Sequence, residues 1–259
     1  MPSSIDTAAD QLFSDHASGR RFASIASLGD LRAAYDVQAA FVDRMCRASG
    51  ARPVGYKIGL TSARMQAMCN IDQPIGGVVL SNRVHATGAL LRLADFGRLG
   101  IEFEIGVRLG RDIGPEGAPF SMEAVSDAVV AICPAMKLVD DRNADYKALD
   151  VISLVADNSW NGGIVLGEFR STWPDLEAIA GTATRNGVEI DRGRGSDVLG
   201  HPLAPLVWLA NHRATRGAGL KSGDIVLTGT LCPTRFPVAG ERYRFDLEGL
   251  GSVEIMVTG

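Results

Sequence analysis

The segment covering residues 101–109 constrains the fold more than any other part of the sequence. It reads Ile-Glu-Phe-Glu-Ile-Gly-Val-Arg-Leu, with an apolar residue at every second position. Because successive side chains of a β-strand point to opposite faces, one face of this segment is apolar, while Glu102, Glu104 and Arg108 share the other. The alternation therefore predicts a strand with one apolar face in a β-rich part of the protein.

The rest of the chain divides into a helical first part and a β-rich second part. Apolar residues recur at helical spacing up to about residue 50, and short β-like runs punctuated by glycine and asparagine follow. We expect an α+β fold in which a small helical region, residues 1–52, packs on a β-rich domain, residues 53–259, as one structural unit. Within that domain, helices are expected over 62–69, 121–132 and 202–216, and strands over 56–60, 78–81, 90–93, 101–109, 224–229, 241–247 and 252–257.

Composition and missing motifs exclude several classes of protein. The 26 Lys and Arg residues nearly balance the 30 Asp and Glu residues, which argues against a nucleic-acid partner. The four cysteines form no Cys-x-x-Cys pair, and the most apolar segment, residues 129–136, is too short to span a membrane. No dinucleotide, phosphate-loop, zinc-protease or serine-hydrolase motif occurs, so no nucleotide cofactor is expected. Without a signal-peptide pattern, we expect a cytoplasmic protein with free thiols.

Glu102 and Glu104 are candidate metal ligands. Alternate residues of a strand place the two carboxylates roughly 7 Å apart on one face. Carboxylate oxygens in such a pair suit a hard divalent cation, with water or substrate completing its shell. The alternative is a solvated polar face, which is the commoner surrounding of a lone Glu-x-Glu pair. The pair alone leaves both interpretations open.

Three further polar positions are ambiguous when each is taken alone. Lys57 lies on a predicted strand whose same-face neighbours are Gly55 and Gly59, so a ligand has room beside its ammonium, which can pair with a carboxylate or exchange a proton. Its alternative is a solvent-facing lysine on an edge strand. Asp72 is an ordinary turn residue unless other site residues lie nearby. The run 157–159, Asp-Asn-Ser, either caps a helix or lines a pocket.

Seven short segments together are more informative than any one of them, and they resemble a known family. They are Gly-Tyr-Lys-Ile-Gly-Leu-Thr-Ser at 55–62, Ile-Asp-Gln-Pro at 71–74, Ile-Glu-Phe-Glu-Ile at 101–105, Val-Asp-Asp-Arg at 139–142, Val-Ala-Asp-Asn-Ser at 155–159, Leu-Gly-His-Pro-Leu at 199–203 with Trp-Leu-Ala-Asn at 208–211, and Gly-Asp-Ile-Val-Leu-Thr-Gly at 223–229. In this order they resemble the 2-oxopent-4-enoate (2-hydroxypentadienoate) hydratase and 4-oxalocrotonate decarboxylase family of aromatic meta-cleavage pathways, within the fumarylacetoacetate hydrolase superfamily.

The resemblance implies a fold, an assembly and a chemistry. The fold is like the fumarylacetoacetate hydrolase C-terminal domain, with a β-rich rolled sheet, and the protein is a homo-oligomer that can associate with a related hydratase or decarboxylase. A magnesium or manganese ion chelates the carboxylate and 2-oxygen of a small 2-oxo or 2-enol acid. In the hydratases, a 2-hydroxy-2,4-dienoate is converted to its ketone, and water then adds at C4 to give a 4-hydroxy-2-oxo acid.

Residue roles follow from the same resemblance, position by position. Lys57 and Asp72 become the candidates for proton transfer, and Glu102 and Glu104 match two metal-binding carboxylates. The positions implied for substrate binding are Thr61, Ser62, Arg142, Asp157, Ser159 and Thr228.

One position departs from the family pattern. Where the family has Pro-Ala-aliphatic-Glu, this chain has Pro134-Ala135-Met136-Lys137, so a lysine replaces the expected third metal carboxylate. An ammonium roughly 4 Å from a divalent ion costs about 8 kcal/mol at an effective dielectric constant of 20. Three outcomes remain open: Lys137 fills the metal position and acts on the substrate, it turns away and leaves a weaker site, or the site is inactive. We favour the first, because two carboxylates facing a lysine are close to neutral without an ion.

Three functions are compatible with these residues. The favoured one is a hydratase of the 2-keto-4-pentenoate type with altered or lost metal dependence. The second is a decarboxylase of a 2-oxo-hex-3-enedioate, which the segments above do not separate from the first. The third, suggested by Lys137, is a catalytically silent paralogue that serves as a binding or assembly subunit.

Overall fold

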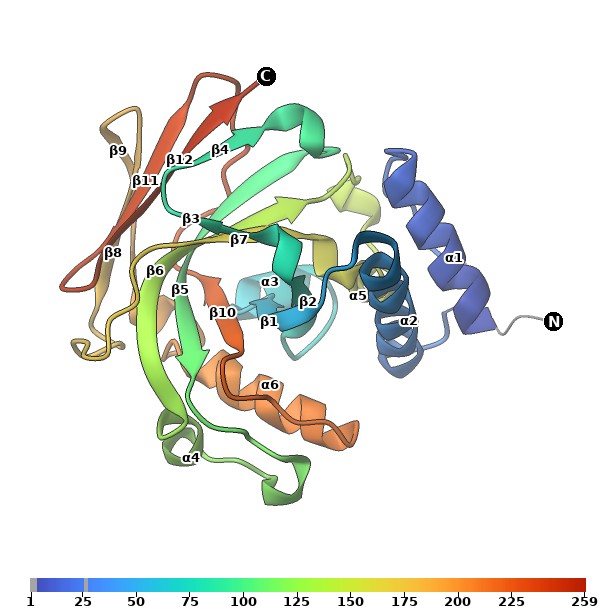
Figure 1. Ribbon diagram of the computed structural model, residues 1–259, viewed down its shortest axis with the longest axis horizontal. Coiled ribbons are helices and arrows are strands. Elements are labelled where there is room, and N and C mark those ends of the chain that lie inside the picture. The colour runs from blue at the N-terminus through green and yellow to red at the C-terminus, as the bar shows by residue number, and fades with distance from the viewer. Residues whose placement is uncertain (1–3, 26–27) are drawn as a thin grey trace.

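Two β-sheets form the body of the protein in the computed structural model, which describes residues 4–25 and 28–259 (Figure 1). In sheet order, the seven-stranded sheet contains β2 (Ile75–Leu80), β1 (Pro53–Gly59), β10 (Ile225–Thr230), β5 (Leu99–Leu109), β6 (Val129–Asp140), β7 (Asn161–Leu166) and β3 (Val84–Ala86). The five-stranded sheet contains β4 (Ala89–Arg92), β12 (Gly251–Thr258), β11 (Arg242–Leu247), β8 (Ala180–Arg185) and β9 (Val188–Arg194). The mixture of helices and strands confirms the predicted fold class.

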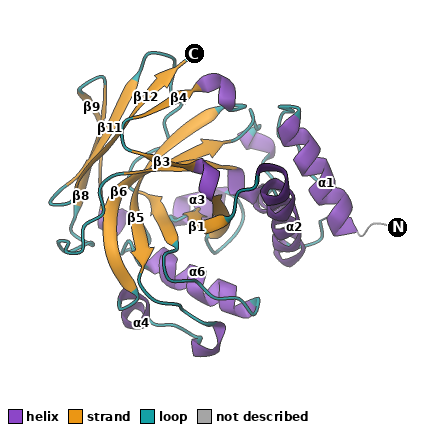
Figure 2. Cartoon of the chain, viewed as in Figure 1, coloured by secondary structure: helices purple, strands orange, loops and turns teal. Residues whose placement is uncertain are grey.

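The main core contains apolar residues of both sheets, whose strands are orange in Figure 2. The apolar residues of β5 alternate as predicted, and every one from Ile101 to Leu109 is at most 1% exposed. Phe103 of this face packs against Phe245 of β11, with ring centroids 5.5 Å apart. Burying this face anchors β5 and therefore fixes which side of the sheet its alternate residues, including both glutamates, must face.

The first two helices lie side by side, away from the five-stranded sheet (Figure 1). A second apolar cluster joins these two helices to α5, with Leu12, Phe41 and Val155 buried in it. No helix in the described part of the chain is long and apolar enough to cross a membrane. The helices are α1 (Ser4–Ala17), α2 (Leu31–Ser49), α3 (Ala63–Met68), α4 (Met122–Ser126), α5 (Val151–Ala156) and α6 (Ala204–Thr215).

The predicted helix over residues 121–132 is wrong in its second half. Helix α4 starts after Ser121, whose side chain accepts a hydrogen bond from the Ala124 N–H, but it ends at Ser126. Residues 129–132 belong instead to β6, which pairs with β5 on one side and β7 on the other. Their β-branched side chains favour a strand, and pairing with β5 decides the outcome.

Candidate active site

A cavity of about 480 Å³ opens beside the seven-stranded sheet. Its charged lining includes Lys57 from β1, Glu102 from β5 and Lys137 from β6. Helix α3 and the loops after β6 and β10 contribute most of the remaining wall, which contains many apolar side chains. These are the surroundings expected for a small-molecule site, in which a few convergent polar groups are set in an otherwise apolar hollow. The apolar part of the lining includes Met65, Met68, Leu149, Leu154, Trp160 and Leu231.

Strand register brings Lys137 onto the two glutamates. Strand β5 pairs antiparallel with β6 so that Glu102 lies opposite Lys137, and Glu104 follows two residues later on the same face. The Lys137 Nζ atom lies 2.5 Å from Glu102 Oε2 and 2.8 Å from Glu104 Oε1. The ammonium therefore sits between both carboxylates, as in the first of the three outcomes considered from the sequence.

Both carboxylates are also held by residues at the end of β10 and just after it. Glu104, which is fully buried, accepts a hydrogen bond from the Gly229 N–H at 2.7 Å through its Oε2 atom. Glu102 accepts one from the Thr234 hydroxyl at 2.9 Å through Oε1. Each carboxylate thus presents one oxygen to a neutral donor and the other to the ammonium of Lys137, which fixes the three side chains relative to one another.

The charges of Glu102, Glu104 and Lys137 change one another's pKa values. Burial favours the neutral acid of Glu102, but the charge and hydrogen bond of Lys137 outweigh it and lower the pKa of that carboxyl. Burial raises the pKa of Glu104, although Lys137 opposes the change. Burial also disfavours the Lys137 ammonium, yet the two carboxylates overcome it and raise the pKa of this lysine well above its ordinary value. Lys137 is consequently a permanent cation at any physiological pH.

Lys57 has the opposite electrostatic character. It is 3% exposed and stands on β1, which is paired with β2 and β10, so the interpretation as a solvent-facing lysine on an edge strand is wrong. Its ammonium donates a hydrogen bond to the main-chain carbonyl of Ser159. Burial, helped by the charge of Lys137, lowers the pKa of Lys57 to about 7. Near neutral pH this amine can therefore either accept or donate a proton.

A glycine makes room for the Lys57 side chain. A Cβ atom at Gly77, on the neighbouring strand β2, would lie 3.0 Å from Lys57 Cε and 2.6 Å from the Asn158 carbonyl oxygen. The sequence pointed to Gly55 and Gly59 as the residues that leave space, and Gly59 does line the cavity. Gly77 was missed because its proximity depends on the pairing of β1 with β2.

Two of the positions implied for substrate binding belong to a buried ion-pair network outside the cavity lining. Arg142 donates to the Asp157 carboxylate, and both side chains are almost completely buried. The other Asp157 oxygen lies 2.5 Å from His16 Nε2 of helix α1. Arg142 also donates to the Arg20 carbonyl at 2.8 Å. These contacts tie the helical first part of the chain to the loops after β6 and α5, which is a structural use of the two residues.

The other predicted positions are divided between the cavity and its surroundings. Thr61 and Ser62 line the cavity, and Ser62 also caps helix α3. Thr228 is buried within β10 and donates to the Ile105 carbonyl at 3.3 Å, so it lies behind the lining. Asp72 is exposed and is not among the lining residues. The structure therefore does not bring Asp72 together with Lys57 in the cavity.

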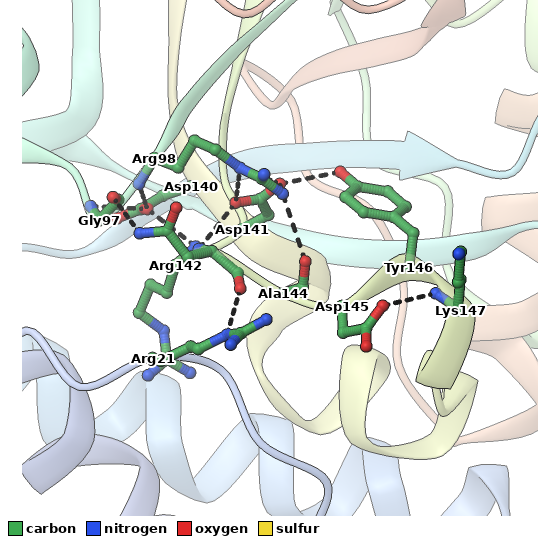
Figure 3. A network of polar contacts seen from close by, with 11 residues as sticks. Arg21, Gly97, Arg98, Asp140, Asp141, Arg142, Ala144, Asp145, Tyr146 and Lys147 are labelled. Atoms are coloured by element: carbon green, nitrogen blue, oxygen red, sulfur yellow. Dashed lines mark hydrogen bonds and ion pairs between the residues drawn. The ribbon is translucent and has the colours of Figure 1, made fainter.

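A polar network that the sequence did not reveal positions one wall of the cavity (Figure 3). Asp141, fully buried at the end of β6, accepts hydrogen bonds from Arg98 Nε at 2.8 Å and from the Tyr146 hydroxyl at 2.9 Å. Tyr146 in turn lines the cavity together with Leu149 of the same loop. The signal in the sequence was limited to the carboxylate at position 141, since Arg98 lies just before β5 and Tyr146 lies in the loop after β6.

The side chains present do not fit a divalent metal ion held by carboxylates. In the described part of the chain, no group of three or more His, Cys, Asp or Glu side chains is placed to hold an ion. The space between Glu102 and Glu104 is filled by the Lys137 ammonium. Glu104 Oε1 has no hydrogen-bond donor among the described residues, so that ammonium is what compensates its charge. An ion there would have to displace a buried cation from both of its partners.

Comparisons with known proteins match most or nearly all of the chain. The family model described as fumarylacetoacetate (FAA) hydrolase C-terminal matches residues 56–258. The 2-keto-4-pentenoate hydratase of Burkholderia vietnamiensis is 34% identical over 260 residues, covering 98% of each chain. The 2-hydroxyhexa-2,4-dienoate hydratase of Comamonas testosteroni is 35% identical over 220 residues, covering 83% of this chain and 82% of its own.

The chain is also similar to the solved structure of a decarboxylase. The 4-oxalocrotonate decarboxylase from Pseudomonas putida G7, complexed with magnesium and adipate, superposes with a TM-score of 0.91 at 26% identity. The match covers 98% of this chain and 97% of that one. A relative of the same fold is thus known with a divalent ion, which contrasts with the lysine-filled carboxylate pair described above.

Proposed function

Because the chain belongs to the fumarylacetoacetate hydrolase C-terminal family, we propose that it is a hydro-lyase acting on a small 2-hydroxy-2,4-dienoate, or the equivalent 2-oxo-enoate, to give a 4-hydroxy-2-oxo acid. One structural observation supports the proposal: Lys57, whose pKa burial lowers to about 7, and Lys137, whose ammonium is held by two carboxylates, line the same largely apolar cavity. The hydratase names of relatives that match nearly the whole chain support this substrate class.

The proposed hydration requires a group that transfers protons and a group that stabilises negative charge, and the cavity contains a candidate for each. Ketonisation of the enol moves a proton from oxygen to carbon, and hydration then adds a proton and a hydroxide across a carbon–carbon double bond. Lys57, with a pKa of about 7, is the group we assign to proton transfer. The Lys137 ammonium stabilises negative charge that develops on the enolate oxygen or is carried by the substrate carboxylate. Thr61 and Ser62 offer hydroxyls for binding, and Asp72 has no part in this assignment because it lies outside the cavity lining.

A turnover assay on 2-hydroxypenta-2,4-dienoate tests the proposal. We expect the wild-type protein to form the 4-hydroxy-2-oxo acid, and Lys57→Met to lower kcat by about 10²–10⁴-fold, the range typical of a lost general acid–base group. Lys221→Met is the matched control, because Lys221 is exposed and pairs with Asp112 on the surface. Full activity of Lys57→Met would remove the assigned role, and absence of turnover in the wild type would remove the proposed function.

The decarboxylase alternative is favoured by one observation, the close superposition with the 4-oxalocrotonate decarboxylase. It predicts carbon dioxide release from 2-oxo-hex-3-enedioate, whereas a hydratase releases none. Product analysis with that diacid separates the two activities. A catalytically silent paralogue, the third possibility, would turn over neither substrate nor any other member of a panel of 2-oxo acids.

We also propose a cytoplasmic homo-oligomer, able to associate with a related hydratase or decarboxylase. The four cysteines are free, which agrees with a reducing compartment. Light scattering coupled to size-exclusion chromatography measures the mass of the assembly, and a mass of 27.4 kDa, that of one chain, would contradict the oligomer.

A further inference from the structure

We propose that the Lys137 ammonium is the resident cation of the Glu102–Glu104 pair, so that this protein neither binds nor needs a divalent metal ion at that position. The inference concerns the charge that faces the substrate in the cavity, and it deepens the proposed function without depending on the reaction being a hydration. It rests on the placement of three side chains on two adjacent strands.

The register between β5 and β6 fixes the position of Lys137 relative to the two glutamates. The pairing of Glu102 with Lys137 across β5 and β6 is one rung in a continuous antiparallel ladder that runs from residue 99 to residue 108 of β5. Since side chains of directly paired residues lie on the same face, the lysine cannot leave that face without shifting the whole ladder. Such a shift would also move the apolar face of β5 out of the main core.

Burial makes the ammonium difficult to remove. The Lys137 side chain is 3% exposed and that of Glu104 is 0% exposed. Beyond its two carboxylates, the ammonium donates to the Ile58 carbonyl of β1 at 3.3 Å. If Lys137 turned away to admit an ion, it would leave these three partners, and a lysine is costly to bury without partners.

The charge balance also argues against a divalent ion at the Glu102–Glu104 pair. Two carboxylates and the Lys137 ammonium sum to one negative charge, and the nearby Lys57, when protonated, brings the group to zero. Adding a divalent ion would give this buried group a net positive charge of about one or two. The ion would also lie next to the Lys137 ammonium, which is buried between the same two carboxylates. The two lysines can thus balance the two carboxylates without an ion.

Manganese binding tests the inference with a readout that needs no substrate. Wild-type protein is dialysed against chelator and titrated with Mn²⁺ alone, and bound metal is measured by electron paramagnetic resonance and elemental analysis. We expect no stoichiometric binding in the wild type. Lys137→Glu restores a third carboxylate, and we expect it to bind one ion per chain at least about tenfold more tightly than the wild type.

The control variant is Lys147→Glu, which makes the same charge change on an exposed residue. It should bind Mn²⁺ no better than the wild type. One Mn²⁺ per wild-type chain that is lost in Glu104→Gln would overturn the inference, and so would a folded Lys137→Glu protein that binds no better than Lys147→Glu. If circular dichroism shows that Lys137→Glu does not fold, the wild-type titration still decides, because it requires no substitution at the site.

Turnover separates this inference from the proposed function. If the wild type is active, activity should be unchanged after chelator treatment, and loss of activity that added Mn²⁺ restores would overturn the inference. If the wild type turns over no 2-oxo acid, the proposed function fails while the metal titration continues to test the role of Lys137.

Discussion

Replacing Lys137 with methionine keeps most of the side-chain volume and removes only the charge and its hydrogen bonds. The variant loses two ion pairs, with Nζ–O distances of 2.5 and 2.8 Å, and leaves the fully buried Glu104 with the Gly229 N–H as its remaining hydrogen-bond donor. Glu104 then has to fold as the neutral acid. Holding a carboxyl of pKa 4.5 neutral at pH 7 costs up to about 3.4 kcal/mol, from 2.5 pH units at 1.36 kcal/mol each; this is an upper limit for the difference from the wild type, in which burial already raises the pKa of Glu104. This agrees with the about 3–5 kcal/mol lost when one partner of a buried ion pair is removed.

The pH dependence has a definite sign. In the variant, Glu104 has a folded pKa raised above its unfolded value. Its neutral form therefore supports folding fully below pH 4.5, and that support is lost as the pH rises towards the folded pKa. The difference in unfolding free energy between wild type and variant should thus be about 3–4 kcal/mol at pH 7 and shrink as the pH falls towards 4.5.

Urea unfolding at a fixed protein concentration, from pH 4.5 to pH 8, measures this difference. Lys147→Met is the control, since a substitution at this exposed lysine should change stability by no more than about 0.5 kcal/mol. A difference for Lys137→Met below about 1 kcal/mol at pH 7, or one that does not vary with pH, would refute the argument that Lys137 compensates a buried carboxylate.

Three other outcomes follow from the same structure. The pKa of Lys57 is depressed, so the wild type should gain stability relative to Lys57→Met as the pH rises from about 7 to about 10, at up to 1.4 kcal/mol per pH unit, measured by urea unfolding. Arg142→Met leaves the buried Asp157 with His16 as its remaining side-chain partner. We expect a loss of about 3–5 kcal/mol in thermal or urea unfolding, but an unchanged kcat in the folded fraction. Tyr146→Phe removes one hydrogen bond to Asp141, and should cost about 1 kcal/mol of stability and raise KM more than it lowers kcat.

The strands with a clear periodic pattern were predictable, and those defined by pairing were not. The alternation of β5 identified its apolar face, which is buried as predicted. Strand β6 was not recognised in the same way. Ser121 and the residues after it carry a real helix start, and the β-branched residues from 129 onward follow without a glycine or proline to mark the change to a strand. Strands β3, β7, β8 and β9 were not predicted either. They owe their conformation to neighbours supplied by other parts of the sheet.

In the site, too, the residues in recognisable segments were predictable, whereas their partners far away in the sequence were not. Lys57, Glu102, Glu104 and Lys137 could be named from their positions in the sequence, and the structure brings all four close together. The donors that hold the two carboxylates could not be named. Gly229 lies 125 residues from Glu104, and Thr234 lies 132 residues from Glu102. Sheet order and the path of the chain after β10 decide these contacts, and no periodic pattern within a single segment encodes them.

Strand β5 also shows where alternation stops being informative. An apolar-polar repeat was compatible with a polar face in solvent, yet Glu104 is 0% exposed and Glu102 contributes to the cavity wall. A face bearing two carboxylates can be covered only if a countercharge is buried with it. The sequence contains that countercharge at Lys137, but only the β5–β6 register shows that it lies opposite Glu102. A charged residue on a neighbouring strand is therefore the feature that distinguishes a buried polar face from a solvated one, and here that residue is Lys137.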